Sequence, residues 1–455
     1  MAKDVDCQKR YTPIQSLMDK QAHTRDFGSF HSSNVQELLA LSEDEYRPPK
    51  YPFDLPNFHG LSNIVFDKNI KETYFMLEGK CVFLNHGAFG GVLKPAQEVA
   101  QKWQIYAERQ PLRFYDRELL PLLTDVTRCL AKFIDCDPTD LVLINNATTA
   151  INTVIRSSSI KTGDVILILS ITYGAVKKLL KQIVLETGAV LKEIEVTFPV
   201  TGEQQLIDLV EKEIVDDKIK LAIFDHIPSN TPIILPVQEL IKLCHSRNIK
   251  VLIDGAHALG SLSLNLKSLH ADFYVSNAHK WFCCPKGAAF LYAKPVHQTS
   301  TRPLVISHGF GSGFNSEFIW SGLHDYSSYL ALLTVIEFWE KVGFEKVLKH
   351  NQDLAKKAGR LLCKAWDTEL MAPEEMFGTM TLVKLPWKIN KSKNLTYTDG
   401  ETIQNMLYTD YNIEVPMKCI EGVICVRISA HIYNTIDEYQ ILATAILEIC
   451  EKHYS

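Results

Sequence analysis

Two residues that can do chemistry follow two short apolar runs of the sequence. Asp254 ends the run of residues 249–253, and Lys280 stands in a polar cluster just after the run of residues 271–275. If both runs are neighbouring strands, a carboxylate and an amine meet at one edge of a sheet. Pyridoxal phosphate requires that pair, since a lysine holds the cofactor covalently and an acid keeps its ring nitrogen protonated. Taken singly, each residue is more often structural.

Other polar groups stand at the ends of predicted strands. Residues 146–150, Asn-Ala-Thr-Thr-Ala, open a predicted helix, whose free N–H groups and Thr hydroxyls suit a phosphate. The alternative is an ordinary threonine N-cap. Tyr173 can stack on a flat ring or simply pack. His257, three residues after Asp254, can move a proton or be a satisfied core histidine.

The neighbours of Lys280 and one distant arginine complete the candidate set. Asn277 and His279 flank the lysine and can donate to a phosphate, although a lone histidine near a strand end is usually structural. Arg427 lies inside an apolar run. A buried guanidinium needs a partner, which is either a substrate carboxylate or a structural salt bridge.

The elements that must position these residues alternate along the chain. Between about residues 115 and 295, helical periodicity alternates with continuous runs of Val, Ile and Leu, which predicts a doubly wound α/β domain with a parallel sheet covered on both faces. Ligands of such sheets bind beyond the carboxyl ends of the strands, where the polar clusters stand. After about residue 325, long helices and strand candidates near 380–385 and 422–429 predict a smaller α+β unit.

The predicted organisation therefore has four parts. Residues 1–60 are polar and form an arm that is loosely ordered or lies on a partner subunit. Residues 61–114 contribute to the small domain and the active site, residues 115–325 form the large domain, and residues 326–455 form the small C-terminal domain.

The composition excludes several classes of protein. The net charge of −5 gives no reason to expect nucleic acid or an anionic membrane as partner. No apolar run approaches the roughly 20 residues of a membrane span, and the N-terminus lacks the apolar core of a signal peptide. Eleven cysteines occur without metal-ligand spacing, so no metal site is predicted. Reduced thiols and a cytoplasmic location are favoured.

Six ordered motifs together resemble the class V aminotransferase family of fold-type-I pyridoxal phosphate enzymes, in particular its isopenicillin N epimerase-like and cysteine desulfhydrase-like branch. They span about residues 80–450. The motifs are residues 83–90, 146–150, 254–257, 277–281 with 285–287, 320–326, and 427–429 with 433–435.

The resemblance implies a role for each matched residue. Lys280 would hold the cofactor and move the substrate α-proton, Asp254 would pair with the ring nitrogen, and Arg427 would bind the substrate carboxylate. The other cofactor contacts it implies are Ala147, Thr148, Asn277 and His279 at the phosphate, Tyr173 on the ring face, and Ser229, Asn230 and His257 near the ring oxygen. On the substrate side it implies Asn85, His86 and Gly87.

Two departures from the family pattern bear on function. Leu323 replaces a threonine that often reaches a phosphate across a dimer interface, although a homodimer with its active site near the interface remains the expectation. Cysteine desulfurases carry a nucleophilic cysteine roughly fifteen residues before the arginine. Here that position is Asn412, and the nearby Cys419 lies in a different setting. Persulfide chemistry on the protein is therefore disfavoured.

The function predicted from the sequence is β-elimination from cysteine or a cysteine derivative. Amino-acid epimerisation or racemisation and transamination are alternatives, because the same residues serve all three reactions. A non-catalytic binding or scaffold protein with this fold is the alternative of another class. The substitution at Leu323 favours it, and the retention of Lys280, Asp254 and Arg427 argues against it.

Overall fold

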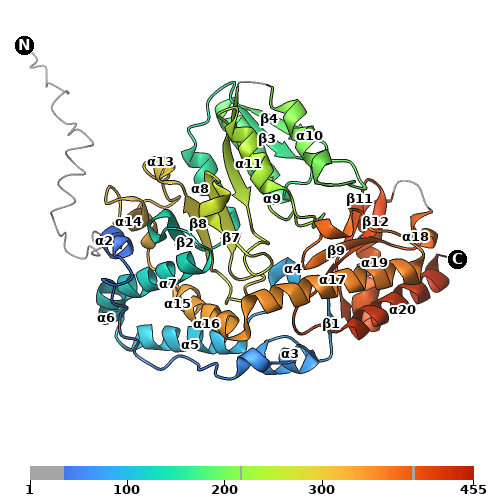
Figure 1. Ribbon diagram of the computed structural model, residues 1–455, viewed down its shortest axis with the longest axis horizontal. Coiled ribbons are helices and arrows are strands. Elements are labelled where there is room, and N and C mark those ends of the chain that lie inside the picture. Colours follow the sequence, from blue (N-terminus) through green and yellow to red (C-terminus); the bar gives the residue numbers. More distant parts are fainter. Residues whose placement is uncertain (1–34, 216–217, 392–394, 455) are drawn as a thin grey trace, which may run out of the picture.

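The computed structural model describes residues 35–215, 218–391 and 395–454. A seven-stranded sheet forms the centre of a large unit, in the order β2-β8-β7-β6-β5-β3-β4. A small C-terminal unit lies beside it (Figure 1). The strands of the large sheet are β2 (Leu141–Ile144), β3 (Val165–Leu169), β4 (Val190–Ile194), β5 (Ile219–Asp225), β6 (Lys250–Asp254), β7 (Phe273–Asn277) and β8 (Ala289–Ala293).

Most of this sheet is parallel, as predicted. The pairs β3–β4, β3–β5, β5–β6 and β6–β7 are parallel, whereas β8 runs antiparallel to both β2 and β7. The sequence patterns did not single out β8. In the register of β5 and β6, Asp225 stands opposite Asp254. The carboxyl ends of these strands therefore bring two acids together.

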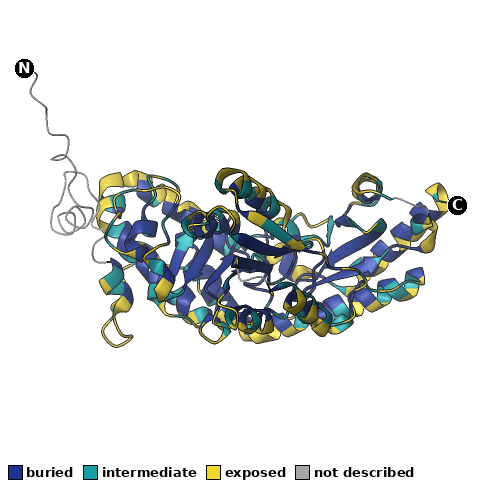
Figure 2. Cartoon of the chain, turned by 90° about the horizontal axis from the view of Figure 1, so that it is seen from above, coloured by how far each residue is buried: buried dark blue, intermediate teal, exposed yellow. Residues whose placement is uncertain are grey.

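Both faces of the sheet are covered by helices. Ile166 and Ile168 of β3 pack in one apolar cluster with residues of α8 (Ala147–Ser157) and α9 (Gly174–Thr187). Leu167 and Leu169 point to the opposite face, as the two-residue period of a strand requires. Figure 2 shows the buried strands between helices whose outer surfaces are exposed. The predicted doubly wound architecture is confirmed.

The second apolar cluster covers that opposite face and includes residues of several other helices. They are α5 (Lys94–Arg109), α7 (Leu119–Phe133), α10 (Glu203–Glu213), α11 (Val237–His245) and α16 (Leu332–Val342). The shorter helical elements are α3 (Lys68–Tyr74), α4 (His86–Phe89), α6 (Pro111–Arg113), η3 (Phe114–Glu118), α12 (Leu266–Leu269), α13 (Pro295–Gln298), α14 (Phe314–Ile319) and α15 (Ser327–Leu330), with 3-10 turns η2 (Leu61–Asn63), η4 (Pro138–Asp140) and η5 (Glu374–Met376).

The small unit is α+β, as predicted. An antiparallel sheet of order β11-β12-β9 packs with long helices on a separate apolar core. Its elements are α17 (Phe344–Trp366), β9 (Met380–Lys384), α18 (Trp387–Asn390), α19 (Tyr397–Tyr411), β10 (Ile413–Glu414), β11 (Met417–Ile420), β12 (Val423–Ser429) and α20 (Ile436–His453). The early strand β1 (Val82–Phe83) pairs with β10, so residues from near residue 80 join this unit.

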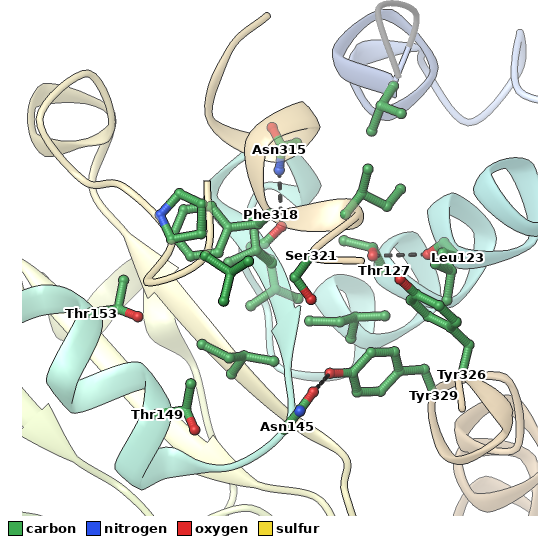
Figure 3. Close-up of a pocket in the computed structure, with 18 of the residues that line it drawn as sticks. Leu123, Thr127, Asn145, Thr149, Thr153, Asn315, Phe318, Ser321, Tyr326 and Tyr329 are labelled. Atoms are coloured by element: carbon green, nitrogen blue, oxygen red, sulfur yellow. Dashed lines mark hydrogen bonds between the residues drawn. The ribbon is translucent and has the colours of Figure 1, made fainter. Parts of the chain in front are cut away.

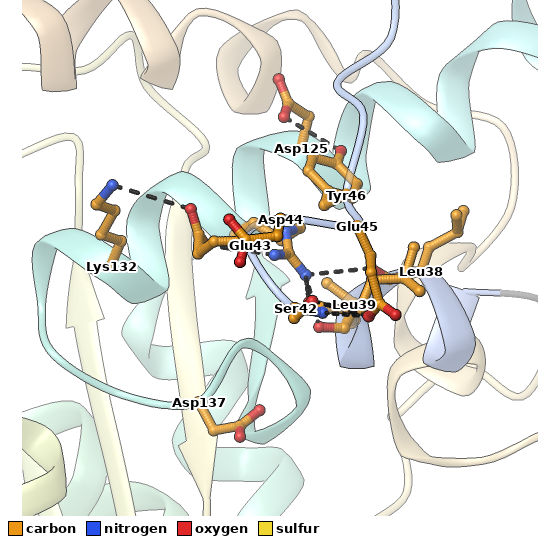
Figure 4. A network of polar contacts seen from close by, with 12 residues as sticks. Leu38, Leu39, Ser42, Glu43, Asp44, Glu45, Tyr46, Asp125, Lys132 and Asp137 are labelled. Carbon is orange, nitrogen blue, oxygen red and sulfur yellow. Dashed lines mark hydrogen bonds and ion pairs between the residues drawn. The ribbon is translucent and has the colours of Figure 1, made fainter.

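The described part of the N-terminal segment is held on α7. Arg128 donates to the carbonyl oxygens of Leu39 and Leu41, both at 2.8 Å, and lies over the ring of Tyr46. The Tyr46 hydroxyl donates to Asp125 at 3.1 Å (Figure 4). The segment begins with α2 (Val35–Ala40). Residues 1–34 of the predicted arm lie outside the described residues.

None of the helices in the described ranges combines the length and the apolar character needed to cross a membrane.

Candidate active site

Lys280 stands in a tight loop directly after β7. Its side chain is largely enclosed, and burial lowers the pKa of its amine to about 8, although the charge of Asp254 acts in the opposite direction. Two glycines allow other backbone to approach this loop. A Cβ on Gly90 would lie 2.6 Å from the Lys280 carbonyl oxygen, and one on Gly260 would lie 2.4 Å from the Trp281 carbonyl carbon. The loop is therefore fixed by backbone on both sides.

Asp254 ends β6 as one of two buried acids. Its Oδ1 accepts from the Ala256 N–H at 3.0 Å. Burial raises the pKa of Asp254, while the Ala256 N–H and the charge of Lys280 oppose the rise. Burial, followed by the charge of Asp254, raises the pKa of Asp225 well above its ordinary value. Asp254 is therefore the member of the pair that ionises first, and Asp225 holds the proton.

His257 contacts the Lys280 amine directly. Its Nε2 lies 3.2 Å from Lys280 Nζ, and its Nδ1 accepts from the indole N–H of Trp281 at 3.2 Å. Burial lowers the pKa of His257 well below its ordinary value, so the ring is neutral. With Nδ1 accepting, the ring proton sits on Nε2 and is donated to a neutral Lys280 amine.

Arg427, in the middle of β12, is buried, yet it forms no ion pair within the ranges that the structure describes. Its Nη1 donates to the backbone oxygen of Ser229 at 2.6 Å and to the Ser229 hydroxyl at 3.2 Å. Its Nη2 donates to Asn85 Oδ1 at 2.9 Å, and Nε has no partner in the described part of the chain. Asn85 in turn donates to Glu414 at 2.9 Å. The structural salt bridge considered for this arginine is absent from these ranges.

A second cation, Lys418, stands close to Arg427. Burial, followed by the charge of Arg427, lowers the pKa of Lys418 to about 8. The charges of Lys280, Arg427 and Lys418 all act on His257. Three groups that can carry a positive charge, all acting on one buried ring, create a site that favours an anion.

The N-terminus of α8 lies beside the end of β7. Asn277 Oδ1 accepts from the Ala147 N–H at 2.9 Å, and Asn146 caps the helix by accepting from the Thr149 N–H at 2.8 Å. Thr148 at this end is exposed. A helix N-terminus with an exposed threonine suits an anionic group. The predicted Asn277 and Ala147 thus contact each other directly.

His279 is oriented by the chain beyond it. Its Nδ1 donates to the Ala288 carbonyl at 2.9 Å, and burial lowers its pKa to about 4. A neutral ring in this tautomer offers Nε2 only as an acceptor. His279 can therefore donate to a phosphate only as an imidazolium, which a phosphate dianion would favour by raising its pKa.

Of the remaining predicted residues, Tyr173 and Asn230 are exposed, whereas His86 is buried. Tyr173, 43% exposed, stands at the rim, and its backbone N–H lowers the pKa of Asp225 through a hydrogen bond. Asn230 is also exposed. His86 instead points into the protein and contacts the Tyr433 hydroxyl at 2.7 Å. The structure thus brings most predicted residues together, but the ring of His86 is fully buried against Tyr433.

An apolar pocket adjoins the α8 end of the site. It contains about 820 Å³ of empty space, part of it open to solvent, between α8, β2, α14 and α2. Asn145, Ser321 and Tyr329 line it, and Figure 3 shows the hydrogen bond between Asn145 and Tyr329. Ser321, from the motif that contains Leu323, therefore reaches the same pocket as Thr149 of α8. Leu323 itself is 71% exposed.

Asp225 and Lys418 were missed by the sequence reasoning as site residues. Asp225 ends an apolar run just as Asp254 does, and that repeated pattern was an available signal. Lys418 lies on β11, whose pairing with β12 places it opposite Cys425, close to Arg427 along the strand. No local pattern marks Lys418, because its place depends on that pairing.

Solved structures share this fold over most of its length. A variant of C-DES with glycine covalently linked to its PLP cofactor superposes with a TM-score of 0.71 at 20% identity, covering 80% of this chain and 96% of the other. The fold is therefore that of the fold-type-I enzymes, as predicted.

Comparison of the sequence with known families identifies one family within this fold. Residues 92–442 match the aminotransferase class-V family, and the chain belongs to that family. It is 31% identical to the L-cysteine desulfhydrase of Arabidopsis thaliana over 436 residues, covering 89% of this chain and 94% of the relative. It is 27% identical to the isopenicillin N epimerase of Streptomyces clavuligerus, covering 82% and 95%. The resemblance inferred from the six motifs is confirmed.

Proposed function

We propose that the chain binds pyridoxal phosphate and cleaves the C–S bond of cysteine or a cysteine derivative. The residues fit the cofactor by the chemistry of their groups. Lys280 supplies an amine of lowered pKa, Asp254 a buried carboxylate for a ring N–H, and the N-terminus of α8 a place for the phosphate. Tyr173 at the rim would cover the ring face.

The observation that carries the proposal is that the buried guanidinium of Arg427 has no carboxylate partner among the residues that the structure describes. A buried arginine without a carboxylate partner is costly unless an anion joins it. Its Nε has no partner in the described part of the chain, while its other donors bind Ser229 and Asn85, so the α-carboxylate of an amino acid would bind through Nε. The charge of Arg427 also lowers the pKa of Lys280, so a carboxylate on Arg427 would lie near that amine.

The reaction follows from these positions. Arg427 would hold the carboxylate while the neutral amine of Lys280, positioned by His257 and then released from that hydrogen bond, takes the α-proton. Pyridoxal phosphate, when bound, accepts the electron pair released at the α-carbon. The sulfur then leaves the β-carbon as a thiolate and takes a proton. With cysteine and one water, the net products are pyruvate, ammonia and hydrogen sulfide.

The cysteines support elimination rather than sulfur transfer to the protein. Asn412 occupies the position of the desulfurase nucleophile and ends α19 in the left-handed conformation. The Cys419 thiol donates to the Leu395 carbonyl at 3.2 Å. Burial raises the pKa of that thiol, which disfavours the reactive thiolate. The relative named L-cysteine desulfhydrase also supports cysteine as the substrate.

Product analysis tests the proposal. The full chain, loaded with pyridoxal phosphate, should release pyruvate, ammonia and sulfide in equal amounts from L-cysteine, or the matching thiol from an S-conjugate. Lys280→Ala should lower kcat/KM by about 10²–10⁴-fold, because it removes the proton acceptor. Arg427→Gln should raise KM more than it lowers kcat, since it removes substrate binding.

Other outcomes would contradict elimination. Solvent deuterium at the α-carbon with the side chain intact would identify an epimerase. Transfer of the amino group to an added keto acid would identify an aminotransferase. Absence of the cofactor's absorbance after incubation with pyridoxal phosphate would indicate a binding or scaffold protein.

We also propose a cytoplasmic homodimer. The described cysteines form no disulfide, in keeping with a reducing compartment. Leu304, Val305 and Ile306 form a run of exposed apolar residues, each 45–54% exposed, on the segment that leads to the exposed Leu323. A contiguous apolar surface of this kind is typical of a subunit interface.

A further inference from the structure

A buried cluster of two imidazoles and a thiol lies behind Lys280. It consists of His86 on α4, Cys283 in the Lys280 loop and His431 after β12, each fully or almost fully enclosed. These residues come from three parts of the chain: the N-terminal segment, the large unit and the small unit. No predicted cofactor or substrate contact uses Cys283 or His431.

The two sulfur-to-nitrogen distances in this cluster match those around a tetrahedral ion, and its three ligand atoms all lie within 4.8 Å of one another. Cys283 Sγ lies 3.7 Å from His86 Nε2 and 3.5 Å from His431 Nε2. Bond lengths of about 2.3 Å to sulfur and about 2.1 Å to nitrogen place two ligands of a tetrahedral zinc about 3.6 Å apart. The Cys283 thiol donates to the carbonyl oxygen of Trp281 at 3.4 Å, so an oxygen able to serve as a further ligand lies beside the sulfur.

The surroundings also suit coordination. His86 Nδ1 lies 2.7 Å from the Tyr433 hydroxyl. Without an ion, Nε2 faces the Lys280 carbonyl oxygen at 3.2 Å and carries the ring proton. On ion binding, that proton would move to Nδ1 and be donated to the Tyr433 hydroxyl, the outer contact that metal-bound histidines usually have. His431 Nδ1 has no hydrogen-bond partner in the described part of the chain, so Nε2, 3.5 Å from the Cys283 sulfur, is the ring nitrogen available to an ion.

We propose that His86, Cys283 and His431 bind one Zn²⁺ ion per chain as a structural site. A thiolate and two imidazoles are the ligands that Zn²⁺ prefers, and a closed, buried position is typical of a structural rather than a catalytic ion. The two rings are now stacked, with centroids 4.2 Å apart and 16° between their planes. On binding, both rings tilt toward the sulfur and the thiol releases its proton to solvent.

The ion would link the Lys280 loop to α4 and to the segment after β12. Cys283 is three residues from Lys280, and the His86 ring also lies 3.2 Å from the Lys280 carbonyl oxygen. Cys283 itself adopts φ +64°, an uncommon conformation for a residue other than glycine. Coordination would hold this turn, α4 and the segment after β12 in one arrangement.

Metal analysis of the full chain tests the site. The protein, loaded with its cofactor and purified without a histidine tag, should contain close to one zinc per chain. When the protein is produced with cobalt in place of zinc, it should show the charge-transfer absorbance of a thiolate bound to tetrahedral Co²⁺. Cys283→Ala and His431→Ala should each lower the metal content at least tenfold.

Cys284→Ala provides a matched control. This neighbouring thiol is equally buried but donates to the Ser328 carbonyl at 3.3 Å, outside the cluster, so its removal should leave the zinc content unchanged. If Cys283→Ala fails to fold, as circular dichroism would show, Cys283→Ser replaces it. Less than one zinc in ten chains of the wild type, with no cobalt–thiolate band, would overturn the proposal. Equal metal loss in the Cys284 variant would also overturn it. Metal content is measured without substrate, so it does not depend on the reaction proposed above.

Discussion

At the scale of single residues, the site depends on how burial changes proton affinity. Burial lowers the pKa of Lys280 to about 8, whereas Asp254 limits the shift. An exposed lysine has a pKa near 10.4 and is almost entirely protonated at neutral pH. A measurable share of Lys280 is therefore neutral near pH 7, which a nucleophile and proton acceptor requires.

The rate of covalent cofactor attachment should follow this ionisation. A pKa of about 8 means that the neutral fraction of Lys280 rises roughly tenfold between pH 7 and pH 9 and then levels off. The observed rate, measured by the absorbance change when pyridoxal phosphate is added to cofactor-free protein, should rise in the same way. Lys280→Ala should show no covalent attachment at any pH. A rate still increasing tenfold per pH unit above pH 9 would mean that the amine is not perturbed.

At the scale of elements, the Lys280 loop is positioned by close backbone approaches. Gly90 ends α4 with φ +71°, and a Cβ there would lie within 2.8 Å of backbone atoms of His279 and Lys280. Backbone atoms cannot move aside as a flexible side chain can. Gly163, also at positive φ (+84°), has open space where its Cβ would lie.

Alanine substitutions at Gly163 and Gly90 should distinguish the cost of a left-handed backbone from the cost of a steric clash. Gly163→Ala should cost about 1–2 kcal/mol of unfolding free energy, from its left-handed backbone alone. Gly90→Ala should cost about 1–3 kcal/mol more, because the methyl group overlaps the loop. Urea denaturation measures both values. Only Gly90→Ala should also slow cofactor attachment. Equal stability losses in the two variants would show that the Lys280 loop moves aside to accommodate the methyl group.

At the scale of the whole molecule, exposed apolar side chains point to a second copy of the chain. Ile306 is 54% exposed within the apolar run 304–306. Leu185 is even more exposed, at 81%, but stands alone on the outer surface of α9. Single exposed apolar residues are common on monomers, whereas contiguous ones are typical of interfaces.

A charged substitution at Ile306 or at Leu185 should show which of the two surfaces is a subunit interface. Light scattering should give the wild type twice the mass of one chain. Ile306→Asp should weaken the dimer by at least tenfold, since it places a carboxylate in an apolar interface. Leu185→Asp should leave the mass unchanged. A wild type that stays monomeric at high concentration, or an Ile306→Asp variant that dimerises normally, would refute this interface.

Local sequence patterns determined most of the elements and the core of the candidate site. Between about residues 115 and 295, helical periodicity predicted the helices and continuous apolar runs predicted the parallel strands, because burial imposes a period of 3.6 on helices and makes strands covered on both faces apolar throughout. Asp254 and Lys280 were recognisable because each directly follows such a run. Strand ends in a parallel sheet necessarily share an edge.

Only the tertiary structure decided which distant groups meet. The opposition of Asp225 to Asp254 depends on strand register, and the position of Lys418 near Arg427 depends on a hairpin. The placement of His86 is the clearest case. As part of a motif it was predicted to face the substrate, but its ring meets Cys283, 197 positions away. Periodicity describes which face of an element is buried. It carries no information about which buried groups face one another, because packing across three separate segments sets those contacts.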